Sequence, residues 1–156
     1  MQSAAPSDLG FLSNRLARLL RMHLSREVAP LGLTATQVAV VLTLGGPDRR
    51  TMSDLAGRIG IDRPTMSGVV ERLARDGWLD SAPNPADGRS RLVGLTARGL
   101  ASLPELADAS ARTTQNASVG LTDQERTALV SLLNRAAENL EHDLADRSPD
   151  HTEGPR

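Results

Sequence analysis

The residues best suited to bind a charged polymer lie on one side of a predicted helix over residues 62–75. Apolar residues recur there at three- and four-residue spacing and define the face expected to be buried: Met66, Val69, Val70 and Leu73. The opposite face is mostly small and polar: Arg63, Pro64, Thr65, Ser67, Gly68, Glu71 and Arg72. Small side chains permit close approach to a nucleic acid, while hydroxyl and guanidinium groups bind phosphates or base edges. We interpret this face as a surface for the DNA major groove. The alternative is a face that only contacts solvent, and this would be the favoured interpretation if the helix were considered without its neighbours.

A second candidate site is the segment Asp87-Gly88-Arg89-Ser90-Arg91. It falls between two β-compatible stretches, residues 78–83 and 91–95, whose connection NPADGRS is rich in loop-forming residues. This pattern predicts a β-hairpin with a basic tip that lies along phosphates or enters a minor groove. Because the charge of Asp87 is unfavourable beside phosphates, we expect its carboxylate to accept a hydrogen bond from Arg89 and fix the direction of that side chain.

Two short helices joined by Gly60-Ile61 are expected to position the first of these sites. Thr51 is a candidate N-cap with Asp54 three residues later, which resembles a capping box, and Gly60 ends that helix. Asp62 caps the next helix, and Pro64 is tolerated in its first turn. Two short helices with a compact glycine-containing turn are typical of a helix-turn-helix.

Longer helices are predicted on both sides of this segment. A leucine-rich face spans residues 8–29, and Thr34 is expected to cap a largely apolar, buried helix over residues 34–44. Helical spacing returns after Thr96, where Pro104 is expected to bend or delay the helix. The last helix starts with a Thr122–Glu125 capping box and carries a second leucine face up to residue 146.

Length, charge and cysteine content narrow the class of protein. The 156 residues fit one domain of ordinary size, and the absence of cysteine excludes disulfides and thiolate chemistry. With neither a leader-like start nor a run of about 18 apolar residues, we expect a cytoplasmic protein without membrane contact. Net charge is only −1, yet residues 49–98 hold nine arginines against six acidic residues, while residues 99–156 are net −5. The positive charge therefore coincides with the candidate DNA-binding segment.

The segment ERLARDGWLDSAPNPADGRSRLVGLTARG, residues 71–99, closely resembles the wing region of the MarR family of bacterial regulators. The resemblance combines a helix ending in Leu73 and Gly77, the pair Asp87 and Arg89, and the run from Leu95 to Gly99. By helix order it extends over residues 8–146. It implies a mainly α fold with a small β-wing: a winged helix-turn-helix lobe at 34–96, and dimerisation helices at 8–29 and 97–146, flanked by a flexible start (1–7) and a disordered tail (147–156).

By this resemblance, the helix 62–75 lies in the major groove and Arg89 enters the minor groove. Many relatives have arginine at the position of Gly88, so we expect affinity to depend more on Arg91. Gly68 also departs from a longer polar residue often found there, so base preference cannot be transferred. A two-fold dimer, which the uncovered leucine faces also favour, predicts a pseudo-palindromic site with half-sites about 10 bp apart.

The resemblance further implies repression relieved by a small aromatic or anionic ligand. Arg15, Arg18 and His23 are candidates for contacting an anion, although a solvated or salt-bridged helix face is the interpretation we favour. The two aromatic residues, Phe11 and Trp78, are expected in the core rather than at a ligand. No cofactor, metal or enzymatic activity is expected, because no nucleophile elbow, phosphate loop or zinc-ligand spacing occurs. A protein-binding adaptor with the same fold is the second alternative, which the basic tip argues against.

Overall fold

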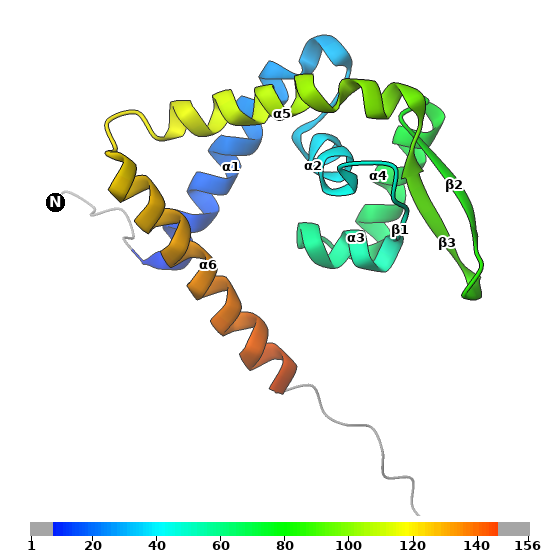
Figure 1. Ribbon diagram of the computed structural model, residues 1–156. Helices are drawn as coiled ribbons and strands as arrows, with labels where there is room; N and C mark the ends of the chain where they lie inside the picture. Colours follow the sequence, from blue (N-terminus) through cyan, green and yellow to red (C-terminus); the bar gives the residue numbers. More distant parts are fainter. Residues whose placement is uncertain (1–7, 147–156) are drawn as a thin grey trace, which may run out of the picture. The chain divides into compact units, whose positions relative to one another are not determined.

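The computed structural model describes residues 8–146, so the predictions for residues 1–7 and 147–156 lie outside the described residues. The fold is mainly helical with a small antiparallel sheet, as predicted (Figure 1). The elements are α1 (Leu9–Glu27), the 3₁₀ turn η1 (Ala29–Leu31), α2 (Ala35–Leu44), β1 (Arg50–Thr51), α3 (Met52–Ile59), α4 (Arg63–Arg75), β2 (Leu79–Asn84), β3 (Asp87–Leu95), α5 (Ala97–Ala117) and α6 (Asp123–Asp146). The chain forms two compact units that divide between Ala117 and Ser118, and α6 belongs to the second.

Side-chain caps begin the helices at the predicted residues. Thr34 and Gln37 form a full capping box, in which the Thr34 N–H donates to Gln37 Oε1 at 2.8 Å. Thr122 and Glu125 form the predicted box at α6. Thr51 caps α3 through the Asp54 N–H, but the Asp54 carboxylate binds two arginine side chains instead of completing a box. Local cap chemistry therefore fixes where the helices start.

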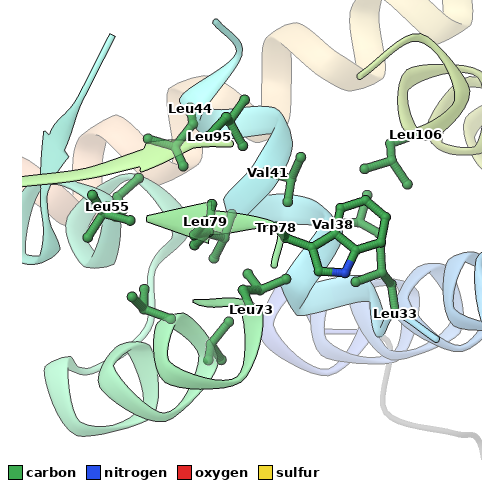
Figure 2. Close-up of a cluster of buried hydrophobic side chains, with 14 of the residues drawn as sticks. Leu33, Val38, Val41, Leu44, Leu55, Leu73, Trp78, Leu79, Leu95 and Leu106 are labelled. Carbon is green, nitrogen blue, oxygen red and sulfur yellow. The ribbon is translucent and has the colours of Figure 1, made fainter. Parts of the chain in front are cut away.

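One hydrophobic core holds the first unit together (Figure 2). Helix α2 packs against α3, α4 and α5, and Val38, Val40 and Val41 are fully buried, as its apolar sequence predicts. The predicted inner face of α4 is also buried, and Trp78 joins the same core. Phe11 differs from the expectation, because 41% of its surface is exposed on α1. Helix α4 is thus set in place by the same side chains that form the core.

The junction between the sheet and α5 explains the Leu95–Gly99 run of the sequence. The Thr96 hydroxyl donates to the Gly77 carbonyl at 2.8 Å and accepts from the Gly99 N–H at 3.2 Å. A Cβ at Gly99 would lie 2.5 Å from the Trp78 carbonyl oxygen, which only glycine avoids. The start of α5 is therefore joined closely to the segment between α4 and β2.

One sequence-based prediction of local structure was wrong, and another was wrong in part. The connection of the hairpin is Pro85-Ala86, so residues 87–91 belong to β3 rather than to a loop. Pro104 was expected to bend or delay the helix; the helix is not delayed, because α5 begins at Ala97 and continues through Pro104. Pro104 is exposed, while Leu106 and Ala109 remain packed in the core, so the proline lies on the outer side of the helix.

Candidate nucleic-acid interface

The first turn of α4 is held by its N-cap residue. Asp62 Oδ1 accepts from the Thr65 N–H, and Oδ2 accepts from the Thr65 hydroxyl, both at 2.8 Å. These two bonds, the backbone one first, lower the pKa of Asp62, so the cap is charged at neutral pH. The Thr65 hydroxyl already donates its proton, which leaves its lone pairs as acceptors on the exposed surface.

The remaining outward residues of α4 make contacts along the helix. The Ser67 hydroxyl donates to Glu71 Oε1 at 3.2 Å, and Arg72 Nε donates to the Gly68 carbonyl at 3.0 Å. A Cβ at Gly68 would lie 3.8 Å from Arg72 Nη2, an ordinary contact, so glycine is not sterically required there. Arg63, Pro64 and Thr65 are exposed at the start of the helix. The candidate residues of α4 therefore share one accessible face.

Hydrogen bonds within the β2–β3 hairpin order its tip. Asn84 Oδ1 accepts from the Ala86 N–H, and Asn84 Nδ2 donates to the Ser90 hydroxyl at 2.8 Å. Ser90 in turn donates to the Asp87 carbonyl at 3.2 Å. Ser90, predicted as a DNA-binding residue, thus makes its hydrogen bonds within the wing, the hairpin formed by β2 and β3. This polar network, rather than burial, extends the strand pairing to Asp87.

The two wing arginines differ in how their guanidinium groups are held. Asp87 Oδ1 accepts from the backbone N–H of Arg89 at 3.0 Å, which corrects the expectation that it binds the Arg89 side chain. Arg91 Nε donates to the Ser81 hydroxyl and Nη2 to the Ser81 carbonyl, at 3.1 and 3.0 Å. Within residues 8–146, no hydrogen bond or ion pair engages the Arg89 guanidinium, which leaves it accessible.

A groove between the start of α2 and α4 was missed by sequence reasoning. It has a volume of about 510 Å³, and its polar lining comes from Thr34, Thr36, Gln37, Thr65, Arg72, Arg75 and Asp76. The Ala35 and Gln37 N–H groups at the start of α2 are already bonded, to Ser25 Oγ and Thr34 Oγ1. The positive end of the helix dipole remains beside the two guanidinium groups of the groove, which favours an anion. The one feature of the sequence that indicated this groove is the three-residue spacing of Arg72 and Arg75 on α4. The position of Thr36 opposite them depends on how α2 packs against α4.

A smaller hollow lies between α1 and α5. It has a volume of about 220 Å³ and is lined by Leu16, Leu19, Leu20, His23, Thr113, Asn116 and Ala117. His23 Nδ1 lies 3.2 Å from the Thr113 hydroxyl, and Nε2 lies 3.2 Å from Asn116 Nδ2. Of the three ligand candidates, His23 lines this hollow, whereas Arg15 and Arg18 are exposed elsewhere on α1.

Comparison with known proteins identifies the family. The sequence profile of the MarR family matches residues 31–90, across the helix-turn-helix and most of the wing. An HTH-type transcriptional regulator of Mycobacterium tuberculosis is 33% identical over 147 residues, which cover 92% of this chain and 94% of the relative. The chain belongs to the MarR family. It is a MarR-family helix-turn-helix transcriptional regulator, and the family assignment implies DNA binding.

Further relatives agree with this assignment. The multiple antibiotic resistance protein MarR of Salmonella typhimurium is 36% identical over 84 residues, which cover 54% of this chain and 56% of that protein. Bordetella bronchiseptica BpsR, whose DNA binding is regulated by 6-hydroxynicotinic acid, is 31% identical, with a TM-score of 0.75 over 83% of this chain and 98% of BpsR. As for the membrane, none of the helices between residues 8 and 146 has the length and apolarity of a membrane span.

Proposed function

We propose that this MarR-family chain is a homodimeric repressor that binds a pseudo-palindromic operator and is released from it by a small-molecule ligand. The observation that carries the proposal is the exposed polar face of α4 in the same compact unit as a wing with an unengaged Arg89 guanidinium. A helix with small, polar outward residues fits the major groove, and a protruding cation fits the minor groove. A dimer bound across a promoter would exclude other proteins from it.

Within this proposal, contacts to the DNA divide between sequence reading and phosphate binding. Arg63, Pro64, Thr65, Ser67 and Gly68 face the bases, and Arg72 joins Arg75 and Thr36 at a phosphate in the groove beside α2. In the wing, Arg89 enters the minor groove. Asp87, Ser90 and Arg91 act mainly by ordering the wing, because each is engaged in contacts within it.

Thr65 is expected to set preference at one base pair. Its hydroxyl donates to Asp62 and so presents an acceptor, which suits the amino group of adenine or cytosine in the major groove. Thr65→Val keeps the shape and the backbone cap but removes the acceptor, and should lose about 1–3 kcal/mol of discrimination at that pair. Selection from a random duplex library measures this.

Ser67→Ala provides the matched comparison, because Ser67 occupies another position on the same face. It should alter preference at a different base pair and leave the Thr65-dependent one intact. If both variants select the same sites as the wild type, neither Thr65 nor Ser67 reads the bases.

The homodimer is supported by exposed apolar side chains on a helix of each unit. Leu9, Leu12 and Leu19 on α1 are each more than 40% exposed, and the apolar face of α6 is also exposed, including Leu140 at 65%. An exposed apolar helix face of this kind marks an interaction site. Association of two copies would bury both faces and present two α4 helices to successive major grooves.

The α1–α5 hollow is the proposed effector site. Its size suits a single aromatic ring, and His23, Thr113 and Asn116 supply polar groups at an otherwise apolar wall. We expect 6-hydroxynicotinic acid, the regulator named for BpsR, to raise the Tm and lower operator affinity. A ligand that binds more tightly to the DNA-free state than to the DNA-bound state must lower DNA affinity by the same factor.

The response should depend on His23. His23→Leu is expected to abolish both the Tm shift and the loss of operator affinity, whereas Arg15→Ala and Arg18→Ala, which alter residues outside the hollow, should retain both. Thermal shift and fluorescence anisotropy measure the two effects. An unchanged response in His23→Leu would place the effector elsewhere.

A further inference from the structure

Arg49 crosses the outer face of the sheet at the base of the wing. The strand order is β1-β3-β2, and Asp80 on β2 pairs in register with Gly94 on the central strand. Arg49, directly before β1, lies over Gly94, and its Nη1 contacts Asp80 Oδ1 at 2.6 Å. The side chain therefore connects one edge of the sheet to the other.

Gly94 makes this crossing possible. A Cβ at Gly94 would lie 2.9 Å from Arg49 Cγ, closer than side chains tolerate, and 3.3 Å from its Cζ, which is a tight contact. Because the obstructing atoms belong to a flexible side chain, any larger residue at 94 would displace Arg49 rather than the strand. Because Gly94 on β3 has no side chain, the guanidinium of Arg49 can pass over the strand and reach Asp80.

The neighbouring residue connects the same strand to the helix-turn-helix. Successive residues of a strand point to opposite faces, and Arg50, which pairs with Val93, contacts Asp54 Oδ2 of α3 at 3.0 Å. Asp54 Oδ1 also accepts from Arg58 Nε at 2.9 Å. The segment formed by Arg49 and the two-residue strand β1 therefore holds the wing through Arg49 and α3 through Arg50.

We propose that Arg49 is a positioning residue for DNA binding: by pairing with Asp80 across Gly94, it fixes the wing relative to the recognition helix. The inference rests on the proposed DNA-binding role of the wing. Side-chain exposures of 35% for Arg49 and 51% for Asp80 make the pair a poor contributor to stability, so its effect is on orientation.

The sign of one substitution separates positioning from direct phosphate contact. Asp80→Asn removes a negative charge, so it should strengthen DNA binding if Arg49 contacts phosphate and Asp80 merely competes for it. If the pair positions the wing, Asp80→Asn should weaken binding of a selected, fluorescein-labelled operator about threefold to fivefold, the size of a surface coupling. The Tm and the slope of affinity against salt should both stay near the wild type.

Gly94→Ala provides an independent test. It should weaken operator binding in the wild-type background and have no further effect once Arg49→Ala has removed the obstructed side chain. Similarly, Asp80→Asn should have no further effect in an Arg89→Ala background, because the contact that it positions is already gone. Additive effects in either pair would overturn the proposal, as would tighter binding by Asp80→Asn.

Failure of this inference is distinguishable from failure of the proposed function. If Arg89→Ala leaves operator affinity unchanged, the wing does not bind DNA, and the part of the proposed function that assigns DNA binding to the wing fails. If Arg89→Ala weakens binding but Asp80→Asn does not, the wing binds DNA and only the role of the Arg49–Asp80 pair is wrong.

Discussion

Replacement of Arg89 by alanine is expected to lower affinity for every DNA sequence by about tenfold to a hundredfold, the range of a lost arginine contact. The guanidinium is accessible at the wing, and the hydrogen bond from its own backbone N–H to Asp87 holds the strand without occupying the side chain. Because a cation near phosphates releases counterions on binding, the slope of log affinity against log salt should also fall by about 0.9. Anisotropy titrations at several salt concentrations measure both quantities.

Arg135→Ala is the matched control, since it removes one exposed arginine from α6, outside the DNA-binding unit. It should change the operator affinity and the salt slope only by the small amount expected for removing one charge far from the DNA. Arg91→Ala should have an intermediate effect, because Arg91 is held against Ser81 and acts by ordering the wing. Wild-type operator affinity in Arg89→Ala would contradict the assignment of the wing.

Disruption of the α6 apolar face is expected to have the largest effect on operator binding. Leu129 and Leu140 lie on one side of α6 and are 41% and 65% exposed. The double variant Leu129→Arg/Leu140→Arg should be a monomer at micromolar concentration. Because a dimer that contacts two half-sites binds about 10²–10⁴ times more tightly than a monomer that contacts one, operator affinity should fall by about a hundredfold or more. Added arginines alone would strengthen DNA binding, so charge cannot explain a loss.

The control places the same charge on another side of the helix. Asn134 is exposed away from the leucine face, and Asn134→Arg should leave both the dimer and operator affinity intact. Sedimentation velocity measures the assembly state, and circular dichroism checks that α6 still forms. A double variant that remains dimeric would contradict a dimer interface formed by this face.

The helices were predictable from sequence because their determinants are local. Thr34, Asp62 and Thr122 cap helices at the expected residues, and the apolar spacing of α4 gave its buried face. The extent of the hairpin was not predictable in the same way. Its strands continue to Asn84 and Asp87 through side-chain hydrogen bonds among polar residues, which a search for apolar alternation cannot detect.

The candidate site was predictable only where one element carries it. The outward face of α4 follows from helical spacing alone, and its individual DNA contacts remain predictions. Thr36 and Arg75 share a groove only because α2 packs against α4. The crossing of Gly94 by Arg49 likewise depends on strand order and register, which bring together residues far apart in sequence. Arg49 and Asp80 had no distinguishing pattern in the sequence.

The most direct test of the central claim is selection of duplexes by the wild-type protein from a random library. We predict enrichment of an inverted repeat with half-sites centred about 10 bp apart, read by two α4 helices in successive major grooves. Enrichment of a single unrepeated motif, or no enrichment over random sequence, would contradict a dimeric, sequence-specific regulator.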